Sequence, residues 1–170
     1  MRTIDWIDGK VQIIDQTRLP AEELVLSLST VEELAEAISS LRVRGAPALG
    51  VAGGLGIALA ALRAQESGED VGEAISQAAC LLASTRPTAV NLKWGIDRVE
   101  KVYDPTQPRM VSELIEQARA MVAEDEKANR IIGEVGADLP ALAAQANGVP
   151  FIVAAPSSTI DLDALNGDAM

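Results

Sequence analysis

The segment from Gly45 to Leu62 constrains this chain more than any other. It contains no charged residue and is rich in glycine and alanine. A helix that is apolar on all sides is buried in a core or spans a membrane. Pro47, the small residues in place of Leu and Phe, and the lack of Trp or Tyr at either end argue against a span. The segment therefore predicts a helix buried on all sides, in which glycines allow close backbone approach.

The residues before this segment predict a small antiparallel sheet. Ile4–Trp6 and Val11–Ile14 flank Asp8-Gly9, a dipeptide typical of a tight hairpin turn. In Leu24–Leu28 the leucines alternate with other residues, which is the period of a strand. We therefore expect a hairpin followed by a third strand.

Most of the remaining pattern is helical. Thr30-Val-Glu-Glu33 fits a capping box at the start of a helix. Helical periodicity also runs through residues 71–83, from Asn91 onward and through 111–135. We expect Thr88 or Asn91 to cap the second of these helices. The sequence thus predicts an α/β protein that is mostly helical, with a small antiparallel sheet and a helical bundle at its N-terminal end.

The character of the chain changes near Leu139-Pro140. A short alanine-rich helix is predicted from Ala141 to Asn147, and the apolar run 149–155 is typical of a fully buried parallel strand. Too little chain follows to give that strand two neighbours. We therefore predict two parts, an N-terminal domain over 1–138 and a fragment of a second domain over 139–170, whose unpaired strand favours self-association.

Composition excludes several classes of function. The net charge is −11, so affinity for nucleic acid or an anionic membrane is not expected, and any bound anion must be held locally. The chain has no histidine and one cysteine, which removes the commonest general base, the commonest metal ligand and an internal disulfide. We expect no metal site, no signal peptide and a cytoplasmic location.

Two segments have the composition of an anion site. In the first, Arg42-Val-Arg44-Gly45-Ala46-Pro47, a basic pair and a glycine precede a helix start, where free N–H groups and the helix dipole attract phosphate. In the second, Pro87 restricts Arg86 to an extended backbone. The alternatives are a simple helix-entry turn with Arg44 in solvent, and a surface arginine at Arg86.

Four strings in the sequence resemble the methylthioribose-1-phosphate isomerase family. In chain order they are Ile4-Asp5-Trp6, Leu41–Gly50, Thr85–Leu92 and Ala128–Gly133. Translation initiation factor 2B regulatory subunits and ribose-1,5-bisphosphate isomerases share the fold, but the second and third strings are more similar to the methylthioribose branch. The resemblance covers nearly the whole chain, and it identifies 139–170 as a remnant of a Rossmann-like parallel-sheet domain.

The resemblance implies a function and a substrate site. Family members convert 5-methylthioribose 1-phosphate to the ribulose phosphate in methionine salvage, an aldose-to-ketose isomerisation that needs no metal or organic cofactor. The residues that contact the sugar phosphate in the family correspond here to Arg44, Gly45, Ala46 and Arg86. Relatives dimerise, so the resemblance also implies a homodimer.

The sequence departs from the family where catalysis is expected. The segments that carry the family's catalytic cysteine and aspartate have no counterpart here, so we predict no catalytic residue and impaired activity. Cys80 is expected to be a buried structural cysteine, and Asp161 and Asp168 to be loop or solvent carboxylates. The alternative functions are a non-catalytic assembly or regulatory module of the initiation factor 2B-like superfamily, and a gene remnant without an independent role.

Overall fold

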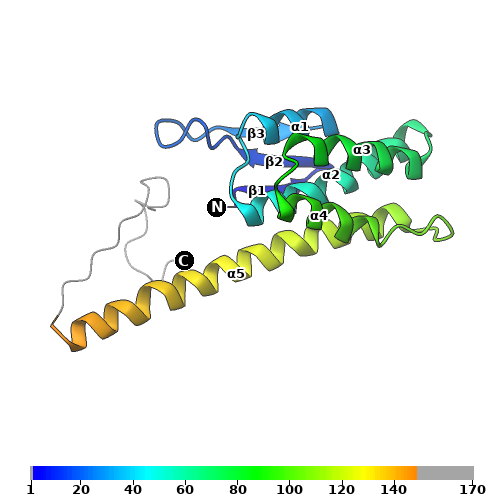
Figure 1. Ribbon diagram of the computed structural model, residues 1–170. Coiled ribbons are helices and arrows are strands. Elements are labelled where there is room, and N and C mark those ends of the chain that lie inside the picture. The colour runs from blue at the N-terminus through cyan, green and yellow to red at the C-terminus, as the bar shows by residue number, and fades with distance from the viewer. Residues whose placement is uncertain (1, 149–170) are drawn as a thin grey trace.

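A computed structural model describes residues 2–148, and the side chains of all of these except 134–141. Three antiparallel strands in the order β1-β2-β3 precede five helices in this part of the chain (Figure 1). The strands are β1 (Ile4–Ile7), β2 (Lys10–Ile14) and β3 (Val25–Leu28). The helices are α1 (Val31–Ser39), α2 (Ala46–Ser67), α3 (Val71–Thr85), α4 (Val90–Glu100) and α5 (Met110–Ala146). The predicted N-terminal sheet and helical bundle are confirmed.

The predicted hairpin and third strand are also confirmed. Asp8 and Gly9 have φ angles of 50° and 72°, the left-handed pair that a two-residue hairpin turn requires. β1 pairs with β2 through Ile7 and Lys10, and Val11 on β2 lies opposite Leu28 on β3. Because alternate residues share a face, one side of the sheet is apolar and packs on the helices.

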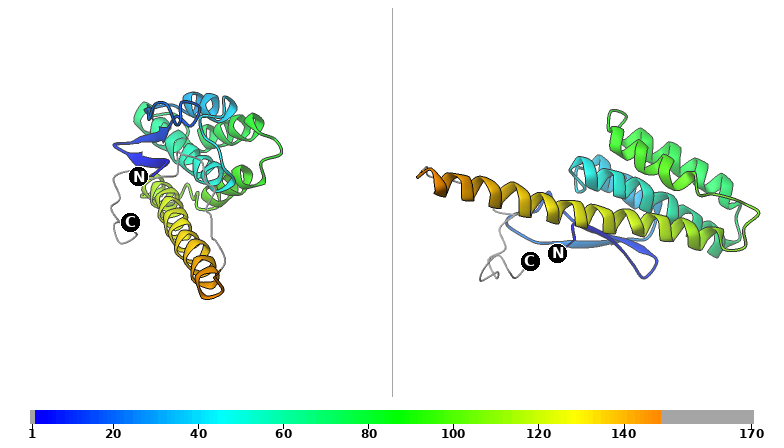
Figure 2. Two further views of the ribbon diagram at one scale, coloured as in Figure 1. Left: turned by 90° about the vertical axis from the view of Figure 1, so that its left-hand side faces the viewer. Right: turned by 90° about the horizontal axis from the view of Figure 1, so that it is seen from below.

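Helix α2 is the centre of the domain, as the sequence predicted. By length and composition it could cross a membrane, but 72% of its apolar window is buried inside the protein. Figure 2 shows the other helices and the sheet arranged around it. Its side chains at Leu55, Ile57 and Leu59 have no exposed surface. The uncharged segment is therefore a core helix in this fold.

Helices α2 and α4 approach each other through glycine. A Cβ on Gly53 would lie 2.6 Å from the carbonyl oxygen of Leu92. A Cβ on Gly95 would overlap the carbonyl oxygen of Gly50 and lie 2.7 Å from its carbonyl carbon. Real Cβ atoms do not make such contacts with backbone, so side chains larger than glycine are excluded at this crossing.

Helix starts follow local sequence in two of the predicted places. Thr30 accepts from the backbone N–H of Glu33, and the Glu33 carboxylate accepts from the Thr30 N–H, which confirms the capping box. Asp70, which was not predicted as a cap, caps α3 with its carboxylate alone, 2.7 Å from the Glu73 nitrogen. At α4 the predicted cap was wrong, because Ala89 occupies the N-cap position and no side chain caps the helix.

The prediction that Cys80 is buried was wrong. Cys80 is exposed and its thiol is free. Helix α3 packs on the core through Ile75, Ala78 and Leu82. Residue 80 lies two positions from Ala78, which places it about 200° around a helix with 3.6 residues per turn, on the opposite side.

Helix α5 is longer than predicted. Two helices were expected, over 111–135 and 141–147, but α5 is a single helix from Met110 to Ala146 that passes through Pro140. Alanines at 137, 141, 143 and 144 favour the helical conformation around Pro140. The second half extends away from the body of the protein (Figures 1 and 2). The division at residue 139 stays a prediction, and the strand at 149–155, Asp161 and Asp168 lie outside the described residues.

Candidate anion site at the starts of α2 and α4

The start of α2 has free backbone donors. Gly45 is the N-cap residue, with φ 94° and ψ 135°, a conformation that L side chains rarely adopt. No side chain caps the helix, and Pro47 occupies its first turn. Residues 44–47 are exposed. The N–H groups of the first turn and the positive end of the helix dipole therefore face outward, as an anion site requires.

The end of α1 sets the path of the chain into this site. Leu41 has a φ of 63°, in the left-handed region that usually selects glycine. The Arg42 N–H donates to the Ala37 carbonyl over 2.9 Å, and the Leu41 N–H donates to Ile38 over 3.2 Å. This is the Schellman arrangement with leucine in the glycine position. It turns the chain sharply, and the sequence analysis did not foresee it.

Gln16 holds the Arg42–Arg44 backbone from the other side. Its backbone N–H donates to the Arg42 carbonyl over 3.1 Å, and its side-chain amide donates to the Arg44 carbonyl over 3.3 Å. The Arg44 guanidinium in turn donates to the Gln16 carbonyl oxygen over 2.8 Å. These three bonds fix Arg44 just before the start of α2. Gln16 was not predicted from the sequence, because a polar residue after a strand has no distinctive pattern.

Asp15 anchors the turn that presents Gln16. Its side chain is 5% exposed and accepts from both the backbone N–H and the hydroxyl of Thr17, over 3.0 and 2.6 Å. A carboxylate oxygen lies 3.6 Å from the Arg42 guanidinium. The hydrogen bond from the Thr17 hydroxyl, helped by the charge of Arg42, holds the pKa of the Asp15 carboxyl below its usual value despite burial. Asp15 is therefore a carboxylate at neutral pH.

Arg86 lies between α3 and α4. It ends α3 with φ −145°, an extended conformation consistent with the restriction that Pro87 imposes. Its carbonyl accepts from the Ala89 N–H over 2.9 Å, which closes a turn into α4. The side chain is half-buried. Its backbone is thus fixed on both sides, as the sequence predicted.

The packing of α2 on α4 brings the two predicted segments to the same end of the domain. On α2, Gly50 lies against Asn91 and Trp94 of α4. Gly53 lies against Leu92 and Ile96, and Gly54 lies against Val99. The contacts advance along both helices in the same direction, so the helices run parallel. Their N-terminal ends therefore lie together. Gly45 and Ala46 begin one helix, and Arg86 precedes the other. The structure also ties the guanidinium of Arg44 to Gln16, which the sequence did not indicate.

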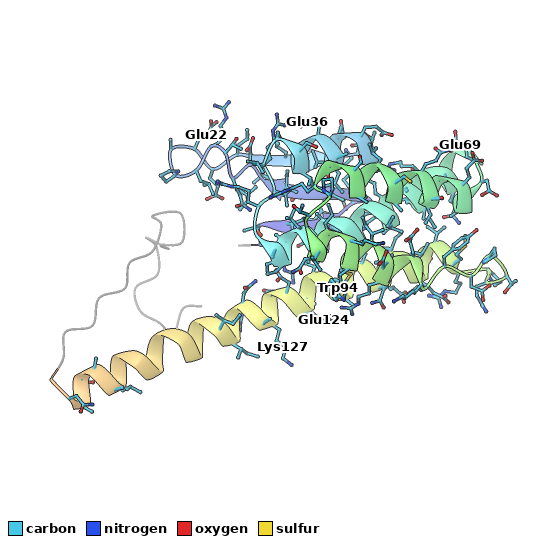
Figure 3. All side chains as sticks on the ribbon, viewed as in Figure 1. Glu22, Glu36, Glu69, Trp94, Glu124 and Lys127 are labelled. Carbon is cyan, nitrogen blue, oxygen red and sulfur yellow. The ribbon has the colours of Figure 1, made fainter. Side chains whose placement is uncertain are left out.

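A groove runs along α4 beside this end. Its volume is about 470 Å³, and its apolar wall includes Val90 and Trp94, which are 79% and 52% exposed. The full lining is Pro87, Ala89, Val90, Lys93, Trp94, Asp97, Arg98 and Lys101. Figure 3 shows Trp94 on α4, at the side that faces α5 and Glu124. This groove was not predicted from the sequence, although Val90 and Trp94 are four residues apart and share a helix face.

Acidic side chains are numerous but do not gather into a metal site in the described region. Among the side chains that the structure describes, those of residues 2–133 and 142–148, no group of three or more Cys, Asp or Glu is placed to hold a metal ion. The positively charged groups at the α2 and α4 starts are the features of this end that suit a ligand, and they suit an anion.

Comparison with known proteins agrees with the resemblance of the four strings. The model of the initiation factor 2 subunit family matches residues 42–140, which include both predicted anion segments. The chain belongs to this family. A methylthioribose-1-phosphate isomerase from Desulforudis audaxviator is 41% identical over 139 residues, which are 79% of this chain and 39% of that protein. A 5-deoxyribose 1-phosphate isomerase from Moorella thermoacetica is 44% identical over 141 residues, 80% of this chain and 40% of the relative.

Solved structures of the family have the same fold. Subunit delta of translation initiation factor eIF-2B from A. fulgidus aligns with a TM-score of 0.66 at 43% identity, over 82% of this chain and 42% of that one. The 5-methylthioribose 1-phosphate isomerase of Pyrococcus horikoshii aligns with a TM-score of 0.55 at 38% identity, over 74% of this chain and 35% of that one. The chain thus spans about 40% of the length of the curated relatives it matches.

Proposed function

We propose that this chain binds the phosphate of a pentose 1-phosphate at the shared end of α2 and α4. The observation that carries the proposal is the parallel packing of the two helices, which places the free N–H groups after Gly45 at the same end as Arg86. Backbone donors and a guanidinium together are the usual partners of a phosphate. Arg44, Gly45, Ala46 and Arg86 are the residues proposed to hold it.

The names of the relatives suggest the reaction of the whole protein. Two of them are isomerases of methylthioribose 1-phosphate and 5-deoxyribose 1-phosphate. We propose that this chain belongs to an aldose-ketose isomerase of that kind and supplies the part that holds the phosphate. The phosphate keeps its charge while hydrogen moves between C2 and C1, so these contacts stabilise ground state and transition state about equally. They bind the substrate without accelerating the chemistry.

Phosphate binding tests the proposal directly. Isothermal titration of the 170-residue chain with inorganic phosphate is expected to show weak binding. Arg86→Ala should weaken it by about 1.5–3 kcal/mol, the range of a charge-assisted hydrogen bond. Arg109→Ala is the matched control, because Arg109 is exposed and precedes α5, beyond the C-terminal end of α4. Equal affinity in wild type and Arg86→Ala contradicts the site.

Activity of the chain by itself is a separate prediction. No residue matches the family's catalytic cysteine or aspartate, and a positioned acid or base contributes on the order of a hundred- to ten-thousand-fold to rate. Ketose formation by the purified chain should therefore be at least about a hundredfold slower than by a full-length relative. Turnover within tenfold of that control, abolished by Arg86→Ala, contradicts this prediction.

A non-catalytic assembly module is the second candidate function. The observation that favours it is the alignment with a subunit of translation initiation factor eIF-2B at a TM-score of 0.66. Ile131, Ile132 and Leu142 on α5 are also 47%, 66% and 61% exposed, which suits self-association as a homodimer. Sedimentation should show association that Ile132→Lys reduces, and a monomer at all concentrations contradicts it. The cytoplasmic location and the absence of nucleic-acid partners stay predictions from composition.

A further inference from the structure

A heptad repeat runs through the whole of α5. Its positions follow one another by three and four residues in turn, which is the spacing of positions a and d in a heptad abcdefg. This row is Val111, Leu114, Ala118, Met121, Asp125, Ala128, Ile132, Val135, Leu139, Leu142 and Ala146. Asp125 is the one polar residue in it. A strict seven-residue repeat is typical of a helix that packs on other helices along its full length.

The body of the protein covers the first half of this row. The four row positions before Asp125 are at most 3% exposed. After Asp125, Ile132 and Leu142 are 66% and 61% exposed, and Ala128 and Ala146 are exposed as well. Figure 1 shows this part of α5 extending beyond the other helices. Among residues 2–148, the second half of the row therefore lacks the packing that stabilises an apolar helix face.

The second half of the row is nearly symmetric in side-chain size. Alanine stands at both ends, and larger apolar residues stand between them. Two such rows match when they lie antiparallel. Ala128 of one protomer then faces Ala146 of its partner, Ile132 faces Leu142, and the two central positions face each other. The row is thus complementary to a second copy of itself.

Charged residues in this half of α5 are mostly placed off the row. Lys127, Arg130 and Glu134 stand at heptad positions c and f, which lie away from the seam of a coiled coil. Asp138 stands at position g, beside the seam. In the antiparallel match this position lies next to the two-fold axis and opposite its own copy, so like charges weaken the pair without blocking it.

The body of the protein selects the antiparallel orientation. It packs against the first half of the row, on the same side of α5 as the second half. A parallel partner would bring its own body into the space that this body occupies. An antiparallel partner places its body near Ala146, at the end of α5 that extends away from the other helices (Figure 2).

We propose that the second halves of α5 from two copies of this chain pair as an antiparallel coiled coil, with the row from Ala128 to Ala146 as its seam. The inference rests on the second candidate function, self-association, and adds to it the surface, the orientation and the register. The seam is about 27 Å long at 1.5 Å per residue. A seam of this length is short, so the dimer forms in concentrated protein and dissociates on dilution.

Disulfide cross-linking of the full chain tests the orientation. All variants carry Cys80→Ser, because Cys80 is exposed and its thiol is free. Ala128→Cys and Ala146→Cys should each form few cross-linked dimers alone and should cross-link when mixed, because the two positions face each other in the antiparallel pair. Arg130→Cys mixed with Ala144→Cys is the matched control. These positions lie at matching levels but on the outer sides, so this mixture should react at least about tenfold more slowly.

Sedimentation of seam variants tests the surface. Leu142→Asn should weaken dimerisation at least about tenfold, because each dimer contains this leucine twice. Its side chain is 61% exposed, so the variant monomer should fold like the wild type. Arg130→Gln is the control on the outer side of the same helix, and it should not weaken dimerisation.

Each other outcome overturns a defined part of the proposal. Cross-linking of Ala128→Cys with itself as fast as in the mixture overturns the antiparallel orientation. Association that Ile132→Lys reduces, without cross-linking in the Ala128→Cys and Ala146→Cys mixture, overturns this pairing and leaves self-association standing. Association that Leu142→Asn does not weaken also overturns the seam. A wild-type chain that is monomeric at all concentrations overturns both the pairing and the assembly function.

Discussion

The crossing of α2 and α4 and the outer half of α5 are both helical, yet different forces hold them. At the crossing, Gly50, Gly53 and Gly95 let two backbones touch, and the surrounding side chains are buried. Among the described side chains, the last ion pairs that join α5 to the body are Arg98 with Glu124 and Arg2 with Glu126. Of the side chains described between residues 127 and 146, all but one are exposed.

The difference teaches that helical periodicity does not reveal what stabilises a helix. Residues of α2 with low intrinsic helix propensity, such as glycine, are helical because tertiary packing requires it. The outer half of α5 depends on its own propensity, which its alanines and leucines supply. The same substitution, such as glycine to alanine, should therefore have opposite effects on stability in the two regions.

The largest effect is expected from Gly95→Ala. The added methyl would overlap the backbone of Gly50, and a backbone atom cannot turn aside as a side chain can. Separating the helices should cost about 3 kcal/mol or more of unfolding free energy, at the upper end of the range for overpacking. Urea denaturation measures this. A loss below about 1 kcal/mol would show that the crossing is looser than the structure describes.

A second comparison lies within α5. Leu114 in its inner half is fully buried, whereas Leu142 in its outer half is 61% exposed. Leu114→Ala should cost about 2–5 kcal/mol, and Leu142→Ala should change unfolding free energy by less than about 0.5 kcal/mol. The two variants remove the same atoms, so each is the control for the other. Equal losses of unfolding free energy in the two variants would show that the two halves of α5 are packed alike.

Arg98 and Glu124 form an ion pair at the boundary between the two halves of α5. The contribution of this pair to stability should depend weakly on pH. Hydrogen bonds from Arg98 hold the pKa of the Glu124 carboxyl below its usual value of 4.5. The pair therefore stabilises the fold above that pH, and the contribution is lost as pH falls through the folded-state pKa. Because Glu124 is largely exposed, Glu124→Gln should cost less than about 1 kcal/mol at pH 7 and a smaller amount at pH 3. Thermal unfolding at both pH values checks this, and a larger loss at pH 3 contradicts it.

A small effect with the opposite sign to that of Gly95→Ala is expected from Gly133→Ala. No atom in the part of the chain that the structure describes lies within 4 Å of a Cβ at Gly133. Alanine in an open helix position is more favourable than glycine by about 0.5–1 kcal/mol. Helix content by circular dichroism should rise slightly, and the global urea midpoint should not fall. A destabilised Gly133→Ala variant would mean that this half of α5 has a close neighbour.

Local chemistry made much of the fold predictable. Asp8-Gly9 predicted the hairpin, Thr30 with Glu33 predicted the start of α1, and the uncharged 45–62 segment predicted the core helix, all of which the structure confirms. Predictions failed where local signals compete. Pro140 marked a break that the helix passes through, and Cys80 lies in an apolar stretch but on the outer side of α3.

The sequence by itself determined which residues have the chemistry of an anion site. Arg44 before a glycine-led helix start and Arg86 before Pro87 are read from neighbours along the chain, since caps, φ restriction and helix dipoles are local. Only the tertiary structure decided that the two starts lie at the same end of the domain, because glycine contacts set α2 and α4 parallel. It also decided that Gln16, 28 residues away, holds Arg44. Such contacts depend on packing between distant segments, and no local pattern encodes them.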